Sequence, residues 1–165
     1  MTNPLFYAKI LLFGEYGIIE DSQGLTLPYS FYKGTLKFSA LESDFEKESN
    51  NSLLKYSDYL KNLQLPESFR LNISKFKKDI KKGLFFDSNI PQGYGVGSSG
   101  ALVAAIFEKY SLNSYEPEQV SKDELMNLRT IFGQMESYFH GKSSGIDPLI
   151  CYMNLPILIE SKESV

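Results

Sequence analysis

Short apolar runs and stretches of alternating character predict several β-strands along the chain. A buried strand is expected over Tyr7–Phe13, where an apolar run interrupted by Lys9 stops at Gly14. Two further short strands are expected over Leu25–Pro28 and Thr35–Ala40, the second because apolar and polar residues alternate in it. Three shorter apolar runs complete the strand candidates: Leu84–Phe86, Leu149–Tyr152 and Ile157–Ile159.

Apolar residues spaced three and four positions apart predict helices. One helix face is formed by Leu53, Tyr56, Leu60 and Leu63. A second helix is expected over Ser98–Leu112. A third begins at the capping box of Ser121 and Glu124 and ends in a loop with two glycines. Its apolar face comprises Leu125, Leu128, Phe132, Met135 and Phe139.

This mixture of strands and helices predicts a layered α/β or α+β fold. We expect a mixed sheet, not an all-parallel one, packed with helices. A chain of 165 residues with 42% hydrophobic residues can bury a core of its own, and no repeat or linker divides it. A single domain is therefore expected.

Composition and charge narrow the class of partner. The net charge of −3 gives no broad attraction to nucleic acid or anionic lipid, and the five lysines of Lys75–Lys82 are more typical of a solvated hairpin or helix face. The single cysteine, Cys151, cannot form an internal disulfide, which favours a reducing compartment. Met1–Lys9 lacks the features of a signal peptide, and no apolar run is long enough to span a membrane. We expect a cytoplasmic protein that binds neither nucleic acid nor membrane.

The segment Ile90–Ala101 is the first candidate site, because three of its glycines precede a predicted helix. Glycines let backbone N–H groups approach an anion closely, and a helix N-terminus favours negative charge. Ser98 and Ser99 could cap the helix, bind phosphate or hold a metal ion. A glycine-rich turn with a serine cap is the alternative. A dinucleotide-binding turn or a Walker loop fits poorly, since a proline-containing loop intervenes and no Lys-Ser/Thr follows Gly100.

Two carboxylates and one lysine form the second candidate site. Glu136 lies at the edge of the apolar stripe of its helix, and Asp147 ends a glycine-containing loop before a predicted strand. One carboxylate could bind Mg²⁺ and the other accept a substrate proton. Lys9, inside an apolar strand, is a suitable partner for Asp147 because buried lysines are usually paired. The alternatives are a surface acid, a turn aspartate and a lysine that faces solvent.

These segments together resemble the GHMP kinases, named for galactokinase, homoserine kinase, mevalonate kinase and phosphomevalonate kinase. The resemblance runs in order through Ala8–Tyr16, Pro91–Ala101 and His140–Asp147, which covers nearly the whole chain. The Ser-Gly-Ile-Asp ending looks most like the mevalonate kinase branch, whereas Gly14-Glu15-Tyr16 also occurs in the phosphomevalonate kinase branch. Val96 stands in place of the family's usual leucine, and Gly100 in place of its usual alanine.

The resemblance implies a role for each matching residue. Asp147 would be the catalytic base, with Lys9 beside it and beside the transferred phosphate. Ser99 and Glu136 would hold Mg²⁺, and substrate contacts would come from Lys9, Glu15, His140 and Asp147. ATP would lie along the glycine-rich segment, on Pro91, Gly93, Gly95, Gly97, Ser98, Ser99 and Gly100.

The implied activity is transfer of phosphate from ATP to a small alcohol, with mevalonate as the expected acceptor. Phosphomevalonate kinase or another GHMP kinase is the alternative within the family, and a non-catalytic nucleotide-binding or regulatory module is the alternative outside it. We expect residues 1–165 to be the N-terminal ATP-binding and catalytic domain, with the C-terminal domain of such kinases absent. The domain alone should then be a poor kinase, and its uncovered apolar face should favour a homodimer or other self-association.

Overall fold

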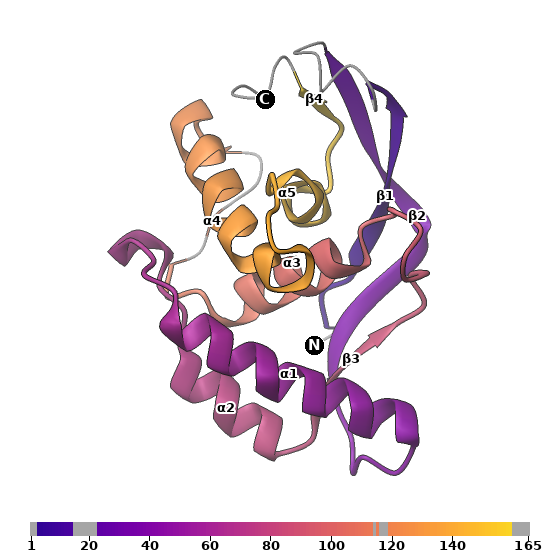
Figure 1. Cartoon of the computed structure of the whole chain (residues 1–165), viewed down its shortest axis with the longest axis vertical. Coiled ribbons are helices and arrows are strands. Elements are labelled where there is room, and N and C mark those ends of the chain that lie inside the picture. The colour runs from indigo at the N-terminus through magenta and orange to yellow at the C-terminus, as the bar shows by residue number, and fades with distance from the viewer. Residues whose placement is uncertain (1–2, 15–22, 114, 116–118, 160–165) are drawn as a thin grey trace.

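A computed structural model describes residues 3–14, 23–113, 115 and 119–159. The strands are β1 (Phe6–Phe13), β2 (Gly24–Phe38), β3 (Leu84–Ser88) and β4 (Ile157–Ile159). The helices are α1 (Asp44–Asn62), α2 (Ile73–Lys81), α3 (Ser98–Tyr110), α4 (Lys122–His140) and α5 (Ile146–Met153), with a short 3₁₀ turn at Glu67–Phe69. The predicted layered α+β architecture is confirmed (Figure 1).

The long strand β2 organises an antiparallel sheet. Gly34 pairs with Phe6 of β1 and with Ser88 of β3, so β1 and β3 lie on opposite edges of β2. Thr26 likewise pairs with both β1 and β4, so β4 shares the β3 edge at the other end of β2. The three pairings in the described residues are all antiparallel, in place of the mixed sheet that was expected.

The extended backbone expected over Leu25–Pro28 is confirmed, and that over Thr35–Ala40 is confirmed as far as Phe38. Their division into two strands is wrong, because both segments belong to the single strand β2. The intervening Tyr29, Phe31 and Tyr32 are aromatic residues that favour extended backbone. Pro28 is tolerated because, within the described pairings, this middle stretch of β2 is paired only with β1. The strand thus runs without a break along the sheet.

The strand expected over Leu149–Tyr152 is also wrong, since this run forms helix α5. A short, wholly apolar run does not distinguish a buried strand from a buried helix. Gly145 at the start and Asn154 at the end both have positive φ, 75° and 51°, and so bound a helix of only two turns. Every residue of α5 except Asp147 is buried.

The helices α3, α4 and α5 lie on one side of the sheet, and α1 and α2 lie side by side next to β3 (Figure 1). The lysine-rich segment is confirmed as a helix face in α2. The predicted capping box at Ser121 and Glu124 starts α4, and a second one at Ser43 and Glu46 starts α1. None of the helices in the described part of the chain has both the length and the apolar character that crossing a bilayer requires.

Candidate functional site

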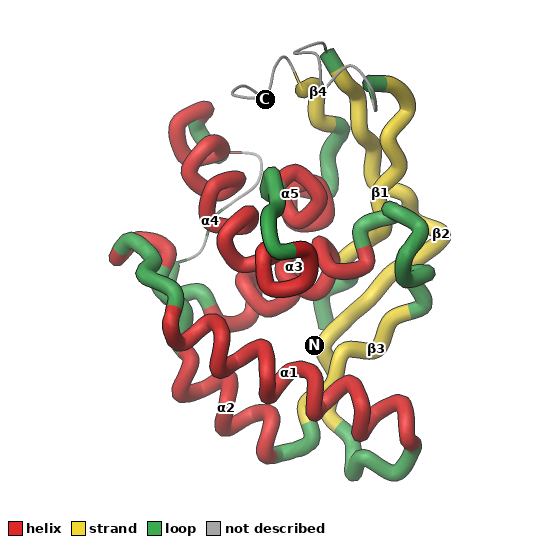
Figure 2. The backbone as a smooth tube through the Cα atoms, viewed as in Figure 1, coloured by secondary structure: helices red, strands yellow, loops and turns green. Residues whose placement is uncertain are grey.

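The glycine-rich segment forms the loop between β3 and the N-terminus of α3 (Figure 2). Gly93, Gly95 and Gly97 have positive φ angles of 81°, 67° and 83°, a region that other residues adopt at a cost. The Lys9 N–H donates to the Val96 carbonyl at 2.9 Å, which fastens the loop to β1. The first-turn amides of α3 thus follow directly on a loop that is fastened to β1, and such free amides at a helix N-terminus can bind an anion.

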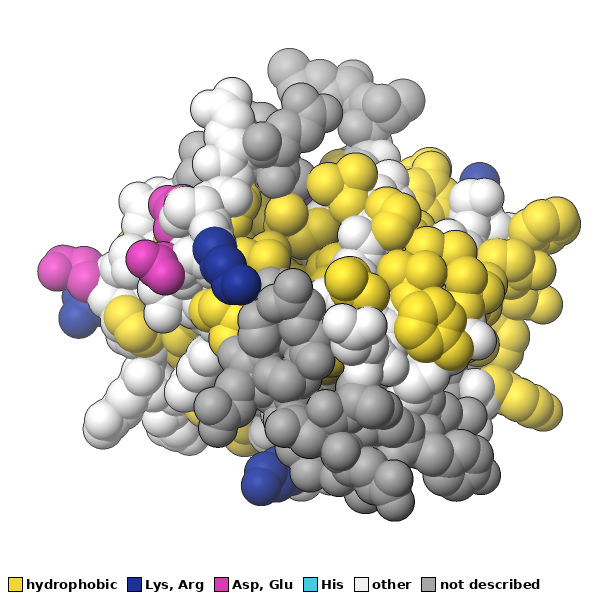
Figure 3. Space-filling model, turned by 90° about the horizontal axis from the view of Figure 1, so that it is seen from above, with side chains coloured by type: hydrophobic (Ala, Val, Ile, Leu, Met, Phe, Trp, Pro, Cys, Tyr) yellow, Lys and Arg dark blue, Asp and Glu magenta, His cyan; other side chains and the backbone are white. Residues whose placement is uncertain are grey.

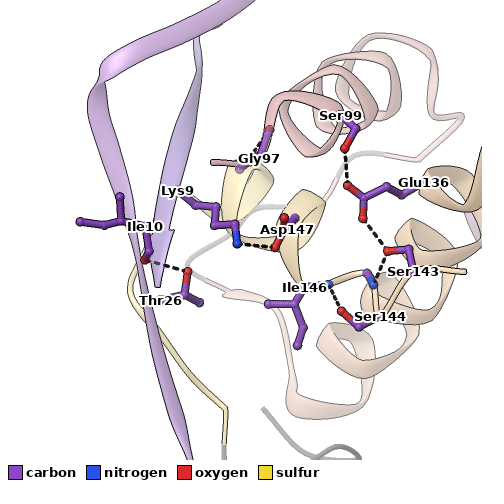
Figure 4. Close-up of polar contacts among 12 residues, drawn as sticks. Lys9, Ile10, Thr26, Gly97, Ser99, Glu136, Ser143, Ser144, Ile146 and Asp147 are labelled. Carbon is purple, nitrogen blue, oxygen red and sulfur yellow. Dashed lines mark hydrogen bonds and ion pairs between the residues drawn. The ribbon is translucent and has the colours of Figure 1, made fainter. Parts of the chain in front are cut away.

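An ion pair stands beside this loop. The Lys9 Nζ lies 3.0 Å from Asp147 Oδ1, and the two side chains are 13% and 33% exposed (Figure 4). The predicted pairing of these residues is confirmed. Asp147 does not end a loop before a strand, however. It lies in the first turn of α5, where the helix dipole favours a carboxylate.

Close packing of α3 against α5 sets the distance between the loop and the ion pair. A Cβ on Gly100 would lie 2.8 Å from the Asp147 carbonyl carbon and 2.9 Å from the Pro148 nitrogen. Gly100 thus lets the N-terminal turns of the two helices meet. The amides that could bind phosphate and the Asp147 carboxylate are consequently held in one place.

Glu136 of α4 reaches the same end of α3. Its Oε1 accepts a hydrogen bond of 2.7 Å from the Ser99 hydroxyl, and the residue is only 3% exposed. Burial raises the pKa of Glu136, against hydrogen bonds from Ser143 and Ser99 that lower it. The negative charge of the Asp147 carboxylate also raises the pKa of Glu136, so the two acids interact electrostatically.

The predicted site residues in the described part of the chain come together. The segment from Pro91 to Gly100, Lys9, Glu136 and Asp147 surround the N-terminus of α3. His140 lies at the same place, with its Nε2 3.0 Å from the hydroxyl of Ser99, the serine expected to bind the metal. Glu15 lies outside the described residues.

The residues that hold the loop between α4 and α5 were not predicted from the sequence. Gly145 has no room for a Cβ, which would lie 1.9 Å from the Arg129 carbonyl oxygen and 2.7 Å from the Gly133 nitrogen. Arg129 Nε donates to the Ser144 carbonyl at 3.2 Å. Ser143 contacts Glu136 directly. An isolated glycine inside a helical pattern, here Gly133, is the one signal that could have indicated this packing.

The residues present fit a magnesium–nucleotide site. Ser99 and Glu136 offer a hydroxyl and a carboxylate oxygen 2.7 Å apart, which are suitable Mg²⁺ ligands. Within the described residues, no group of three His, Cys, Asp or Glu side chains could hold a metal by itself. A Mg²⁺ ion here would need phosphate oxygens and waters as further ligands, which is its usual mode in phosphoryl-transfer sites.

Comparisons with known proteins show the family and the fold of the chain. Residues 58–154, more than half of the chain, match the family described as "GHMP kinases N terminal domain". The fold is similar to that of mevalonate kinase from L. major, in a structure described as a complex with R-mevalonate, with a TM-score of 0.53 and 16% identity. It is also similar to mevalonate kinase from Methanococcus jannaschii, with a TM-score of 0.55 and 15% identity.

The two alignments cover 96% and 98% of this chain but only 48% and 54% of those kinases. The chain therefore spans about half the length of the kinases that it matches. A search of curated proteins gave no match.

Proposed function

Since the chain belongs to the GHMP kinases, as their N-terminal domain, we propose that it supplies the ATP-binding and proton-accepting side of a small-molecule kinase. The observation that carries this proposal is the Lys9–Asp147 ion pair, set beside the glycine loop and the N-terminus of α3. An anion-binding helix end next to a paired carboxylate is what phosphoryl transfer to an alcohol needs.

In the proposed reaction, the acceptor oxygen forms a bond to the γ-phosphorus of ATP while the bond to the leaving ADP breaks. The hydroxyl proton passes to the Asp147 carboxylate. A weak base is adequate because the transition state is loose and the proton need not leave early. Lys9 holds Asp147 in place and offers positive charge to the transferred group.

The phosphates would lie over the first-turn amides of Ser98, Ser99 and Gly100. Gly97, which has no side chain, would let the backbone come close to them. Ser99 and Glu136 would hold Mg²⁺, which neutralises phosphate charge when bound. For the acceptor we propose mevalonate, because the two similar solved structures are mevalonate kinases. In those proteins the matched part is about half the chain, so we infer that the rest of a complete site would come from a second half of that kind.

The test has two stages. Calorimetry with the non-hydrolysable analogue AMP-PNP, with and without Mg²⁺, should show metal-dependent binding to this domain. A coupled assay of the full protein against mevalonate, phosphomevalonate, galactose and homoserine should then show ADP release with one acceptor, mevalonate. Nucleotide binding without turnover on any alcohol would favour a non-catalytic module, and absence of metal-dependent binding would contradict the proposal.

A further inference from the structure

Ser143, which belongs neither to the glycine-rich segment nor to the ion pair, links Glu136 to the start of the helix that carries Asp147. The Ser143 hydroxyl donates to Oε2 of Glu136 and accepts a hydrogen bond of 3.0 Å from the Gly145 N–H (Figure 4). Gly145 is the N-cap of α5, two positions before Asp147. One hydroxyl therefore joins the carboxylate on α4 to the start of the helix that carries the other.

The Glu136 carboxylate has a separate partner on each oxygen. Oε1 accepts from Ser99 on α3, and Oε2 accepts from Ser143. A carboxylate held through one oxygen can rotate about its last bond, whereas one held through both has a fixed plane. Because Glu136 is buried, losing either partner would also leave a desolvated polar atom without compensation.

The loop that carries Ser143 is itself held in place. Arg129 Nε binds the Ser144 carbonyl, and Gly145 lies against the backbone of Arg129 and Gly133 without room for a Cβ. The main chain of Ser143 also lies near Gly133, where a Cβ would come within 3.0 Å of the Ser143 carbonyl oxygen. The hydroxyl of Ser143 is thus presented to Glu136 from a fixed backbone.

We infer that Ser143 is a positioning residue that aims Oε1 of Glu136 at the metal position beside Ser99 and keeps it in register with Asp147. This inference rests on the proposed function. It assigns a role to a residue that would contact neither nucleotide nor acceptor. Partners of this kind, behind a metal ligand, typically contribute 10- to 100-fold to metal affinity.

The test is the gain in AMP-PNP affinity on adding Mg²⁺, measured by calorimetry for matched variants. Ser143→Ala should reduce this gain about 10- to 100-fold and leave the metal-free affinity unchanged. Ser143→Thr keeps the hydroxyl and should retain most of the gain. Ser137→Ala is the control. Ser137 is half-buried on α4, the helix of Glu136, but its hydroxyl donates to the Gly133 carbonyl and not to Glu136. A wild-type gain in Ser143→Ala would overturn the positioning role.

A second measurement separates failure of this inference from failure of the proposed function. If the wild-type protein shows no gain with Mg²⁺, the proposed function fails. Amide hydrogen exchange then tests the contact between Ser143 and the Gly145 amide in the absence of any ligand. The Gly145 amide should exchange faster in Ser143→Ala than in wild type or in Ser137→Ala, because its acceptor is gone. Equal exchange in all three proteins would overturn the tie between Ser143 and the loop.

Discussion

Glycines of the candidate phosphate loop share a backbone conformation but differ in what surrounds them. A Cβ on Gly93 or Gly95 would meet nothing within 4 Å. On Gly97 it would lie 3.0 Å from Lys9 Cγ and 3.5 Å from Cys151 Sγ. Gly97 is therefore the position where the loop, the lysine of the ion pair and the core of α5 meet.

This difference gives a matched pair of variants. Gly97→Ala and Gly141→Ala should both lose about 1–2 kcal/mol of unfolding free energy, because alanine disfavours a positive φ. Gly141 lies outside the loop, and a Cβ there would also meet nothing within 4 Å. Only Gly97→Ala should also displace Lys9 and weaken Mg²⁺–AMP-PNP binding about tenfold, a change of about 1.4 kcal/mol. Urea unfolding and calorimetry measure the two effects. Equal nucleotide affinity in the two variants would show that Gly97 is not part of the nucleotide-binding site.

At the scale of single residues, the sequence predicted which site residues pair with each other but not which residue holds them in place. Lys9 with Asp147 could be predicted because a cation in an apolar strand needs a partner, and Ser99 with Glu136 through the resemblance. Ser143 could not be, because a serine in a glycine-containing loop looks like any turn residue. Its role appears only when the loop folds back on α4.

Among the secondary-structure elements, the contact between α3 and α5 holds the N-terminus of α3 close to Asp147. The sequence identified α3 and α4 because periodicity and a capping box marked them. It misassigned α5, whose burial on nearly every side removes any periodic signal. It also split β2, because strand pairing depends on partners distant in sequence.

Gly100 lies at this contact, and it yields a prediction with an unusual sign. In an exposed helix, Gly→Ala stabilises by about 0.4–1 kcal/mol. Gly100→Ala should instead destabilise by about 1–3 kcal/mol, because the new methyl would meet the backbone of Asp147 and Pro148. Nucleotide affinity should fall with it as α3 moves away from α5. A more stable variant in urea unfolding would show that the helices tolerate the added methyl.

Across the whole molecule, apolar side chains gather at the end where β1, β2 and β4 meet (Figure 3). Leu12, Phe13 and Leu158 on these strands are 54%, 52% and 46% exposed. An exposed patch of this kind is typical of a surface that another chain or domain covers. Self-association through this face stays a prediction.

We propose that Asp147 takes up the proton of the acceptor hydroxyl at a site where Lys9 and the α3 N-terminus hold the nucleotide. Steady-state turnover of Asp147→Asn in the full protein with mevalonate, measured beside its Mg²⁺–AMP-PNP affinity, tests this role. We predict a loss of about 10²- to 10⁴-fold in kcat, because the amide cannot accept the proton. Nucleotide affinity should stay within a few-fold of wild type. Near-normal turnover in the variant would show that Asp147 is not the proton acceptor.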